Sequence, residues 1–114
     1  MPTKSSSPPG LDHLYVITRL DVPQPHRSVQ IAHAAMAAVN TFGFTPGKPH
    51  PNLVICAVAT ETELIEAFNR LKELGVPCCG WHEDDMHEQL TAVATAPLFG
   101  DVRRPLKRFK LLTS

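Results

Sequence analysis

The sequence predicts a single α/β domain in three layers, with a mixed sheet of about four strands flanked by helices. A continuous apolar run, Leu53–Ala59, is typical of a strand that is buried on both faces, as in a parallel sheet. An alanine-rich segment with helical spacing precedes this run, and a capped, leucine-spaced segment follows it. The alternation of strands and helices within 114 residues fits one domain with right-handed crossovers.

The composition excludes several classes of protein. The chain carries 11 Lys+Arg against 11 Asp+Glu, whereas proteins that coat nucleic acid non-specifically are strongly basic. No apolar run approaches the roughly 18 residues needed to cross a bilayer, so no membrane association is expected. The three cysteines lack the spacing of a disulfide framework and the N-terminus lacks a secretory signal, which together indicate a cytoplasmic protein.

The N-terminal half predicts a leader, a strand and a helix. Residues 1–11 are rich in serine and proline and predict a disordered leader, so that the domain occupies residues 12–114. Leu14–Leu20 is rich in β-forming residues and predicts the first strand. Residues 28–42 predict a thin, alanine-rich helix that Ser28 would cap and that Gly43 would end.

The second predicted helix has the strongest local signals. Thr60 and Glu63 form a capping box at its start, and Gly75 supplies the left-handed residue expected at its end. Its apolar face is formed by Leu64, Phe68, Leu71 and Leu74.

Three more strands are expected in the rest of the chain. They are Val76–Trp81, Leu90–Ala96 and the edge strand Pro105–Leu112. The basic residues between Arg103 and Lys110 either protect that edge from aggregation or contact phosphates.

Polar residues surround the turn between the first strand and the first helix. The carboxyl end of a strand, facing a helix N-terminus, is the usual ligand position in α/β sheets and favours a phosphate or carboxylate. Gln30 and His33 are three residues apart, so both can face the same side of the helix. Alternatively, His33 is a half-buried histidine packed between helix and sheet. The polar set is Arg19, Asp21, His26, Arg27, Gln30 and His33.

Two other segments have the residue types of a site. The acidic segment 83–88 precedes Thr91, and a carboxylate near a hydroxyl can orient or deprotonate water, although most acidic loops are only solvated. Cys78, Cys79, His82 and His87 superficially resemble zinc ligands. Because neighbouring residues of a strand point to opposite faces, we expect no metal there.

Several segments together resemble the type-2 peptidyl-tRNA hydrolase family, from about Leu14 to Leu112. They are YVITRLD followed by QIAHAAMAA, then TETELIEAFNRLKELGVP, TAVATAP and LKRFKLL. The resemblance implies a compact α/β fold that hydrolyses the ester between a peptide and the 3′ end of tRNA, with no metal and no cofactor. Gln30 and Thr91 match two of the positions with which the family's activity is associated.

The sequence departs from the family at two places. His26 stands four residues before Gln30, where the family has a lysine, and HEDDMHEQL replaces an Asp-Ala-Gly-Arg-Thr stretch, with Asp84 or Asp85 as a loose substitute for the aspartate. An imidazole can act as a base in place of the lysine, and Arg27 can supply the cationic charge. The expected catalytic set is His26, Gln30, Asp85 and Thr91. The expected substrate-binding set is Arg19, Asp21, Arg27 and His33.

Two hypotheses of function follow. The first is an esterase acting on peptidyl-tRNA or another acylated RNA end. The second is a catalytically degenerate domain that binds an RNA end or a protein partner through the same groove. A small metal-binding protein is a third, subsidiary hypothesis. The resemblance also implies a homodimer.

Overall fold

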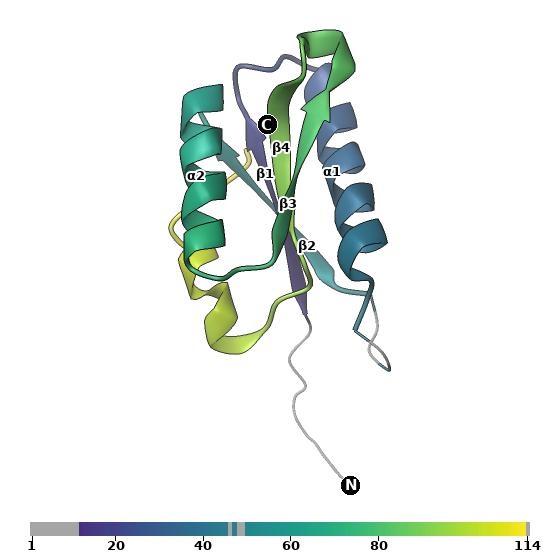
Figure 1. Ribbon diagram of the computed structural model, residues 1–114, viewed down its shortest axis with the longest axis vertical. Coiled ribbons are helices and arrows are strands. Elements are labelled where there is room, and N and C mark those ends of the chain that lie inside the picture. Colours follow the sequence, from purple (N-terminus) through teal and green to yellow (C-terminus); the bar gives the residue numbers. More distant parts are fainter. Residues whose placement is uncertain (1–11, 46, 48–49, 114) are drawn as a thin grey trace, which may run out of the picture.

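A mixed five-stranded sheet lies between two helices in the computed structural model, which describes residues 12–45, 47 and 50–113 (Figure 1). The predicted leader, residues 1–11, lies outside these residues. The helices α1 (His26–Phe42) and α2 (Glu61–Glu73) lie on opposite faces of the sheet, which confirms the three-layer α/β prediction. The strands are β1 (His13–Arg19), β2 (Asn52–Val58), β3 (Cys78–Glu83), β4 (Gln89–Thr95) and β5 (Lys110–Leu111).

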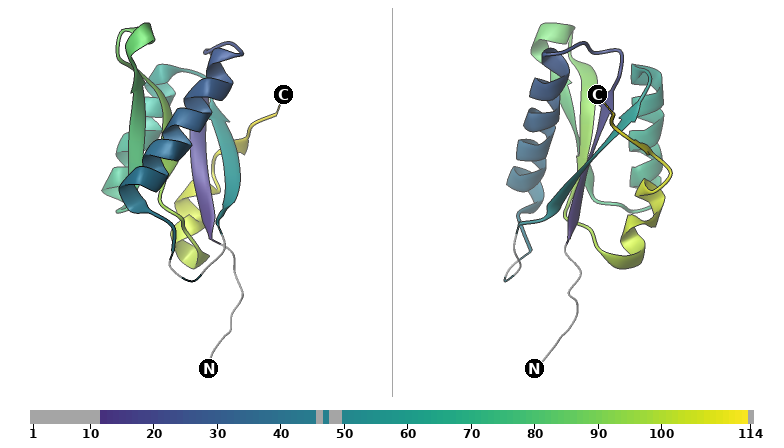
Figure 2. Two further views of the ribbon diagram at one scale, coloured as in Figure 1. Left: turned by 90° about the vertical axis from the view of Figure 1, so that its right-hand side faces the viewer. Right: turned by 180° about the vertical axis from the view of Figure 1, so that it is seen from behind.

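The strands follow the order β3-β4-β1-β2-β5. β1 and β2 run parallel and are connected through α1, whereas every other neighbouring pair is antiparallel. As a result, the carboxyl end of β1, the start of α1 and the β3–β4 connection lie at the same end of the molecule (Figures 1 and 2). That connection contains a short 3-10 helix, η2 (Asp84–Met86).

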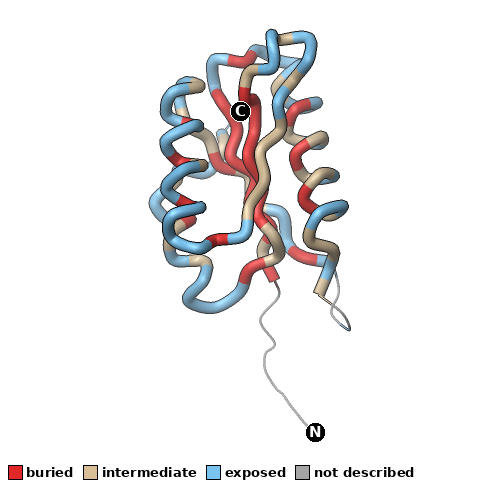
Figure 3. The backbone as a smooth tube through the Cα atoms, viewed as in Figure 1, coloured by how far each residue is buried: buried red, intermediate tan, exposed pale blue. Residues whose placement is uncertain are grey.

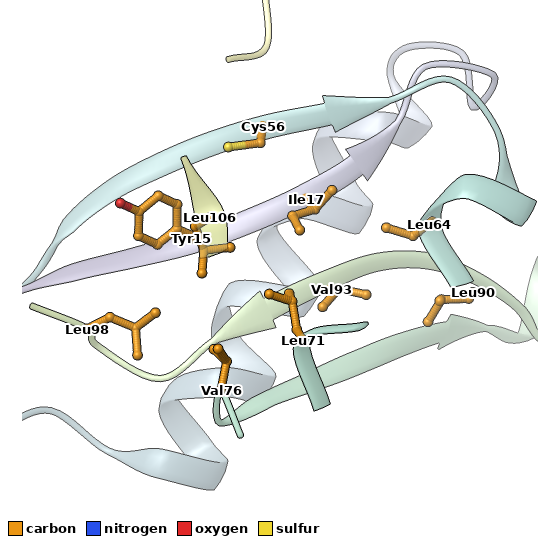
Figure 4. Close-up of a cluster of buried hydrophobic side chains, with 10 residues drawn as sticks. All are labelled: Tyr15, Ile17, Cys56, Leu64, Leu71, Val76, Leu90, Val93, Leu98 and Leu106. Atoms are coloured by element: carbon orange, nitrogen blue, oxygen red, sulfur yellow. The ribbon is translucent and has the colours of Figure 1, made fainter. Parts of the chain in front are cut away.

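Each face of the sheet has its own hydrophobic cluster. On the α2 side, Leu64 and Leu71 pack against Ile17 of β1 and Val93 of β4 (Figure 4). The cluster on the α1 side is built from smaller residues: Leu14, Val16, Ala34, Ala38, Ala92 and Ala94. The central strands β1 and β4 are buried, while the outer faces of both helices are exposed (Figure 3).

The signals at the ends of α2 are confirmed. The Thr60 hydroxyl accepts the backbone N–H of Glu63, and the Glu63 carboxylate accepts the backbone N–H of Ala59. Gly75 follows the helix with φ of 78°, a conformation that residues with a Cβ rarely adopt. On the predicted apolar face, however, Leu74 is 48% exposed, because it lies at the very end of the helix.

The first helix begins two residues earlier than predicted, which removes Ser28 from the capping position. α1 starts at His26, directly after Pro25, and Ser28 lies inside its first turn. The Gln24 side chain takes the capping role instead, because its Oε1 accepts both the backbone N–H and the hydroxyl of Ser28, at 3.0 and 2.7 Å.

Two predictions about strands are wrong. β2 is not buried on both faces: only Cys56 is buried and Leu53 is 60% exposed, because both helices pack on β1, β3 and β4 instead. The C-terminal strand is only two residues long. Pro105 and Leu106 belong to the 3-10 helix η3 (Gly100–Leu106), which buries Leu106 in the α2-side cluster. The fifth strand, short as it is, raises the sheet from the predicted four strands to five.

No helix within the described residues is long and apolar enough to cross a membrane.

Gly80 of β3 has no room for a side chain. A Cβ at this position would lie 2.7 Å from Leu90 Cδ1 and 3.0 Å from Phe68 Cε2. We therefore expect Gly80→Ala to lower the free energy of unfolding by about 1–3 kcal/mol, as overpacked cores do, when measured by urea denaturation. The loss of unfolding free energy should be smaller in a Leu90→Val background, because valine lacks the Cδ1 atom that lies closest to the added Cβ. An equal cost in both backgrounds would contradict this account of Gly80.

Candidate functional site

A β-bulge in the β3–β4 hairpin sets the geometry of the site. Trp81 pairs with Ala92, but the next residue, His82, pairs with Leu90, so Thr91 is an extra residue in β4. On one side of the bulge Leu90 joins the α2-side cluster, and on the other Ala92 joins the α1-side cluster. Bulges re-aim side chains, and this one directs the Thr91 hydroxyl toward α1.

Thr91 and Gln30 form a buried polar pair under α1. The Thr91 hydroxyl donates to Gln30 Oε1 at 2.9 Å and also lies 3.3 Å from the carbonyl oxygen of Trp81. Gln30 is 3% exposed and Thr91 is 0% exposed, so neither side chain is open to solvent. A buried amide must be hydrogen-bonded to be tolerated, and Thr91 satisfies its oxygen.

The same amide continues the hydrogen-bonded chain to Glu83, at the end of β3. A hydrogen bond from the Gln30 side chain holds the pKa of the Glu83 carboxyl below its ordinary value of 4.5. Burial opposes this shift, and smaller contributions in the same direction come from Trp81 Nε1, the backbone N–H of Asp85 and the charge of His33. Glu83 is therefore ionised at neutral pH and lies at the solvent end of the Thr91–Gln30 pair.

An aromatic pair borders this carboxylate. The His33 ring, from α1, stacks on the Trp81 ring, from β3, with centroids 4.6 Å apart and planes 12° from parallel. Both residues are half-buried. Trp81 Nε1 lies 3.4 Å from Glu83 Oε1, so the stack and the carboxylate form one continuous surface.

Arg19 connects the end of β1 to the start of β4. Although it is only 6% exposed, its guanidinium makes four hydrogen bonds: two to the Asp21 carboxylate, one to Gln89 Oε1 and one to the carbonyl of Leu90. The hydrogen bond from Arg19 lowers the pKa of Asp21. In this conformation Arg19 and Asp21, two of the four predicted substrate-binding residues, are bonded to each other, and Arg19 is also bonded to the start of β4.

Arg27 and the first turn of α1 are also internally bonded. The Arg27 guanidinium donates to the carbonyls of Val22 and Leu20 and so holds the loop that leads into α1. The backbone N–H of Arg27 bonds to the carbonyl of Pro23, and that of Ser28 to Gln24. These two donors of the helix N-terminus are therefore already used, which limits the anion site expected there.

The structure joins two of the four predicted catalytic residues. Gln30 and Thr91 are in contact, whereas His26, one helical turn before Gln30, is exposed and has no side-chain hydrogen bond within the described part of the chain. Asp85 is exposed in η2 and contacts the site through its backbone N–H, which donates to Glu83 at 3.5 Å. Glu83, rather than Asp85, is the acidic residue that reaches Gln30.

Sequence reasoning missed Trp81 and Gln89 and did not single out Glu83 within the acidic segment. Trp81 and Glu83 are two residues apart on a strand, so their side chains share a face. That spacing could have pointed to the pair, but the bulge that brings Thr91 to the same face has no signal in the sequence.

The cysteines and the basic segment contribute none of the hydrogen bonds described for this site. Cys78 packs on the α2-side cluster and Cys79 beside the α1-side cluster, and burial raises the pKa of Cys78 to about 11, so it stays a thiol. Among the residues described, no three His, Cys, Asp or Glu side chains gather as metal ligands do. Of the basic residues, Arg103 donates to the Tyr15 hydroxyl and Arg104 lies 3.4 Å from Asp101, in η3 at the other end of the molecule (Figure 1).

Comparison with known proteins supports the fold alone. No family model and no curated protein matches the chain. A solved structure of a protein of unknown function, Atu0240 from Agrobacterium tumefaciens strain C58, is similar to it with a TM-score of 0.64. The two are 15% identical over 89% of this chain and 97% of that chain.

The first prediction from this site concerns the buried pair. Thr91→Val should lower the free energy of unfolding by about 1–3 kcal/mol in urea denaturation, because it leaves the buried Gln30 oxygen without a donor. Thr91→Ser, which keeps the hydroxyl, should cost less. Adding Gln30→Met to Thr91→Val should recover part of the loss, since both partners are then apolar. Additive costs in the double variant would contradict the hydrogen bond.

The second prediction concerns pH. Because the pKa of Glu83 is lower in the folded protein than in the unfolded chain, its carboxylate stabilises the fold above pH 4.5, and this contribution is lost as the pH falls through the folded pKa. Glu83→Gln should therefore be less stable than the wild type at neutral pH, and the difference should narrow in urea titrations at more acidic pH.

Glu88 provides the control, because its shift has the opposite sign. Its hydrogen bond and like charge with Asp84 raise the pKa of Glu88 above 4.5. The folded state thus loses stability as the pH rises through that pKa, and Glu88→Gln should gain stability relative to the wild type in that range. Parallel pH profiles for the Glu83→Gln and Glu88→Gln variants would contradict both assignments.

Proposed function

We propose that this protein hydrolyses the ester that joins a peptide or another acyl group to the 3′ end of tRNA, as its resemblance to type-2 peptidyl-tRNA hydrolases implies. One observation carries the proposal. Gln30 and Thr91, which match the family's functional positions, are hydrogen-bonded to each other, and the chain of contacts continues to the ionised carboxylate of Glu83.

Ester hydrolysis needs a water molecule, a base and donors for the developing oxyanion. His26 is the proposed base: its exposed imidazole accepts a proton as the water oxygen attacks the ester carbonyl, and returns it to the 3′ oxygen when the ester bond breaks. Glu83 accepts a hydrogen bond from the water and orients it. Gln30 and Thr91 act through Glu83 as positioning residues, since both are buried.

The remaining predicted residues support this end of the molecule. Arg27 and the Arg19–Asp21 pair hold the loop between β1 and α1, and therefore the first turn that carries His26. Asp85 adds negative charge beside Glu83 and donates its backbone N–H to it.

A homodimer also stays a prediction. Among the described strands β3 pairs only with β4, so its other edge offers a place for a second copy.

The burial of Gln30 and Thr91 favours a second candidate function. Neither side chain can touch a substrate in this conformation, and the family's lysine is replaced by His26. A domain that no longer catalyses ester hydrolysis would still present the exposed start of α1 and the β3–β4 hairpin to an RNA end. It would bind acylated tRNA without releasing the acyl group.

The assay that tests these candidates follows the release of free tRNA from N-acetyl-aminoacyl-tRNA. If His26 is the base, His26→Ala should lower the rate on the order of 100-fold. His50→Ala provides the matched control, because His50 is also an exposed histidine but lies just before β2, whose first residue Asn52 pairs with His13 at the far end of β1. Its rate should equal that of the wild type.

The outcomes separate the two functions. If no tRNA is released even when enzyme and substrate are equimolar, the esterase is rejected. Binding of the same tRNA without release would then support the second candidate, and its salt dependence would measure the share of phosphate contacts.

A further inference from the structure

The His33–Trp81 stack is a flat aromatic surface at the rim of the proposed site. Its two rings come from different elements, α1 and the edge strand β3, and lie nearly parallel at 4.6 Å. Trp81 rests partly on the α1-side cluster, yet both residues keep part of their surface exposed. A nucleobase can extend such a stack, because every base has a π-face and stacking depends little on sequence.

The stack is connected to the site by two contacts. The backbone carbonyl oxygen of Trp81 lies 3.3 Å from the Thr91 hydroxyl. The indole Nε1 of Trp81 lies 3.4 Å from Glu83 Oε1. A carboxylate beside a bound base is suited to accept a hydrogen bond from a ribose hydroxyl, as acidic residues do in dinucleotide-binding sites. Glu83 can thus hold a ribose while the rings hold its base.

The charges around the stack select against a phosphate. Asp84, Asp85 and Glu88 lie on the same hairpin as Glu83 and are exposed or form contacts among themselves. Arg19 at the end of β1 and Arg27 at the start of α1 already bond to Asp21 and to backbone carbonyls. An internal nucleotide, which has a phosphate on its 3′ oxygen, would meet these carboxylates, whereas the last nucleoside of an acylated RNA has an uncharged ester there.

We propose that the His33–Trp81 stack and Glu83 bind the terminal nucleoside of the acylated RNA, an adenosine in tRNA, with the base on the rings and the 2′-hydroxyl on the carboxylate. This inference rests on the proposed function and names the part of the substrate that the site recognises. Binding in this way sets the 3′ ester next to the carboxylate that the Gln30–Thr91 pair orients. Affinity for the nucleoside would come from stacking and one hydrogen bond, so it would depend little on salt.

The chain contains one tryptophan, so the emission of Trp81 reports directly on the stack. Adenosine, titrated into the full-length protein with excitation at the red edge of the indole absorption, should change that emission saturably. The trinucleotide CCA, which ends in the same nucleoside, should bind at least as well. Two analogues, 2′-deoxyadenosine and adenosine 3′-phosphate, should bind more weakly. The first lacks the 2′-hydroxyl that bonds to Glu83, and the phosphate of the second is repelled by the Glu83 carboxylate.

His33→Ala should weaken adenosine binding on the order of tenfold, the usual effect of removing one stacking side chain. Alanine is a strong helix former, and far-UV circular dichroism checks that α1 is intact. Asn40→Ala is the matched control, because Asn40 is exposed on the same helix, about two turns further on, and should leave binding unchanged.

The results for binding and for hydrolysis can be told apart. Saturable adenosine binding without ester hydrolysis would support the nucleoside site and reject the esterase. If the esterase is active, His33→Ala should raise KM for acylated tRNA but leave KM unchanged for an acyl ester without a nucleoside. No saturable change in Trp81 emission, equal affinity for adenosine and its 3′-phosphate, or an unchanged KM in the His33→Ala variant would each overturn the inference.

Discussion

The buried hydrogen bond between Thr91 and Gln30 is the constraint on which the functional end of this molecule depends. An amide at 3% exposure is unfavourable unless its oxygen and nitrogen are both bonded, so the strand below α1 must present a donor at this point. Regular alternation along β4 would turn Thr91 to the α2 face. The extra residue of the bulge turns it to α1 instead, at the cost of one unpaired position in the hairpin.

From that bond outward, each contact fixes the next. Gln30, with its oxygen held by Thr91, directs its nitrogen to Glu83, and Glu83 in turn accepts from Trp81 and from the backbone of the η2 turn. On the other side of β4, Arg19 bonds to the carbonyl of Leu90, the residue before Thr91. The residues of the bulge are thus held by two contacts, Gln30 on Thr91 and Arg19 on Leu90, and the hydrogen-bonded chain leads from a fully buried residue to a half-exposed carboxylate.

The sequence allowed the elements to be predicted better than the site, for physical reasons. Local signals such as the Thr60–Glu63 capping box and the left-handed Gly75 act within a few residues and appear in the structure as expected. The burial of β2 depends on which strands the helices cover, which the local sequence does not determine. The length of β5 is also not a local property, because Leu106 packs in the α2-side cluster as part of η3 and not in a strand. The residue pattern alone points to Gln30 near the end of the first strand and to Thr91 after the acidic segment, and the resemblance adds that both match functional positions. The role of Glu83 depends on the bulge at Thr91, which lies 61 residues after Gln30 in the chain. A pattern within a few residues cannot encode a contact over that separation.

The alanine-rich composition of α1 has a consequence beyond helix propensity. The buried members of the cluster beneath α1 are four alanines with Leu14 and Val16, and larger residues such as Trp81 pack around them only partly buried, whereas most buried members of the cluster beneath α2 are leucine, valine and isoleucine. Small side chains let a helix approach a sheet closely, and a Gln side chain is short enough to reach a strand hydroxyl only when that approach is close. A bulkier residue at Ala34 or Ala38 would lift α1 from the sheet and lengthen the contact between Gln30 and Thr91. The thin profile of this helix is therefore part of the site, because it sets the distance across which the buried polar pair must bond.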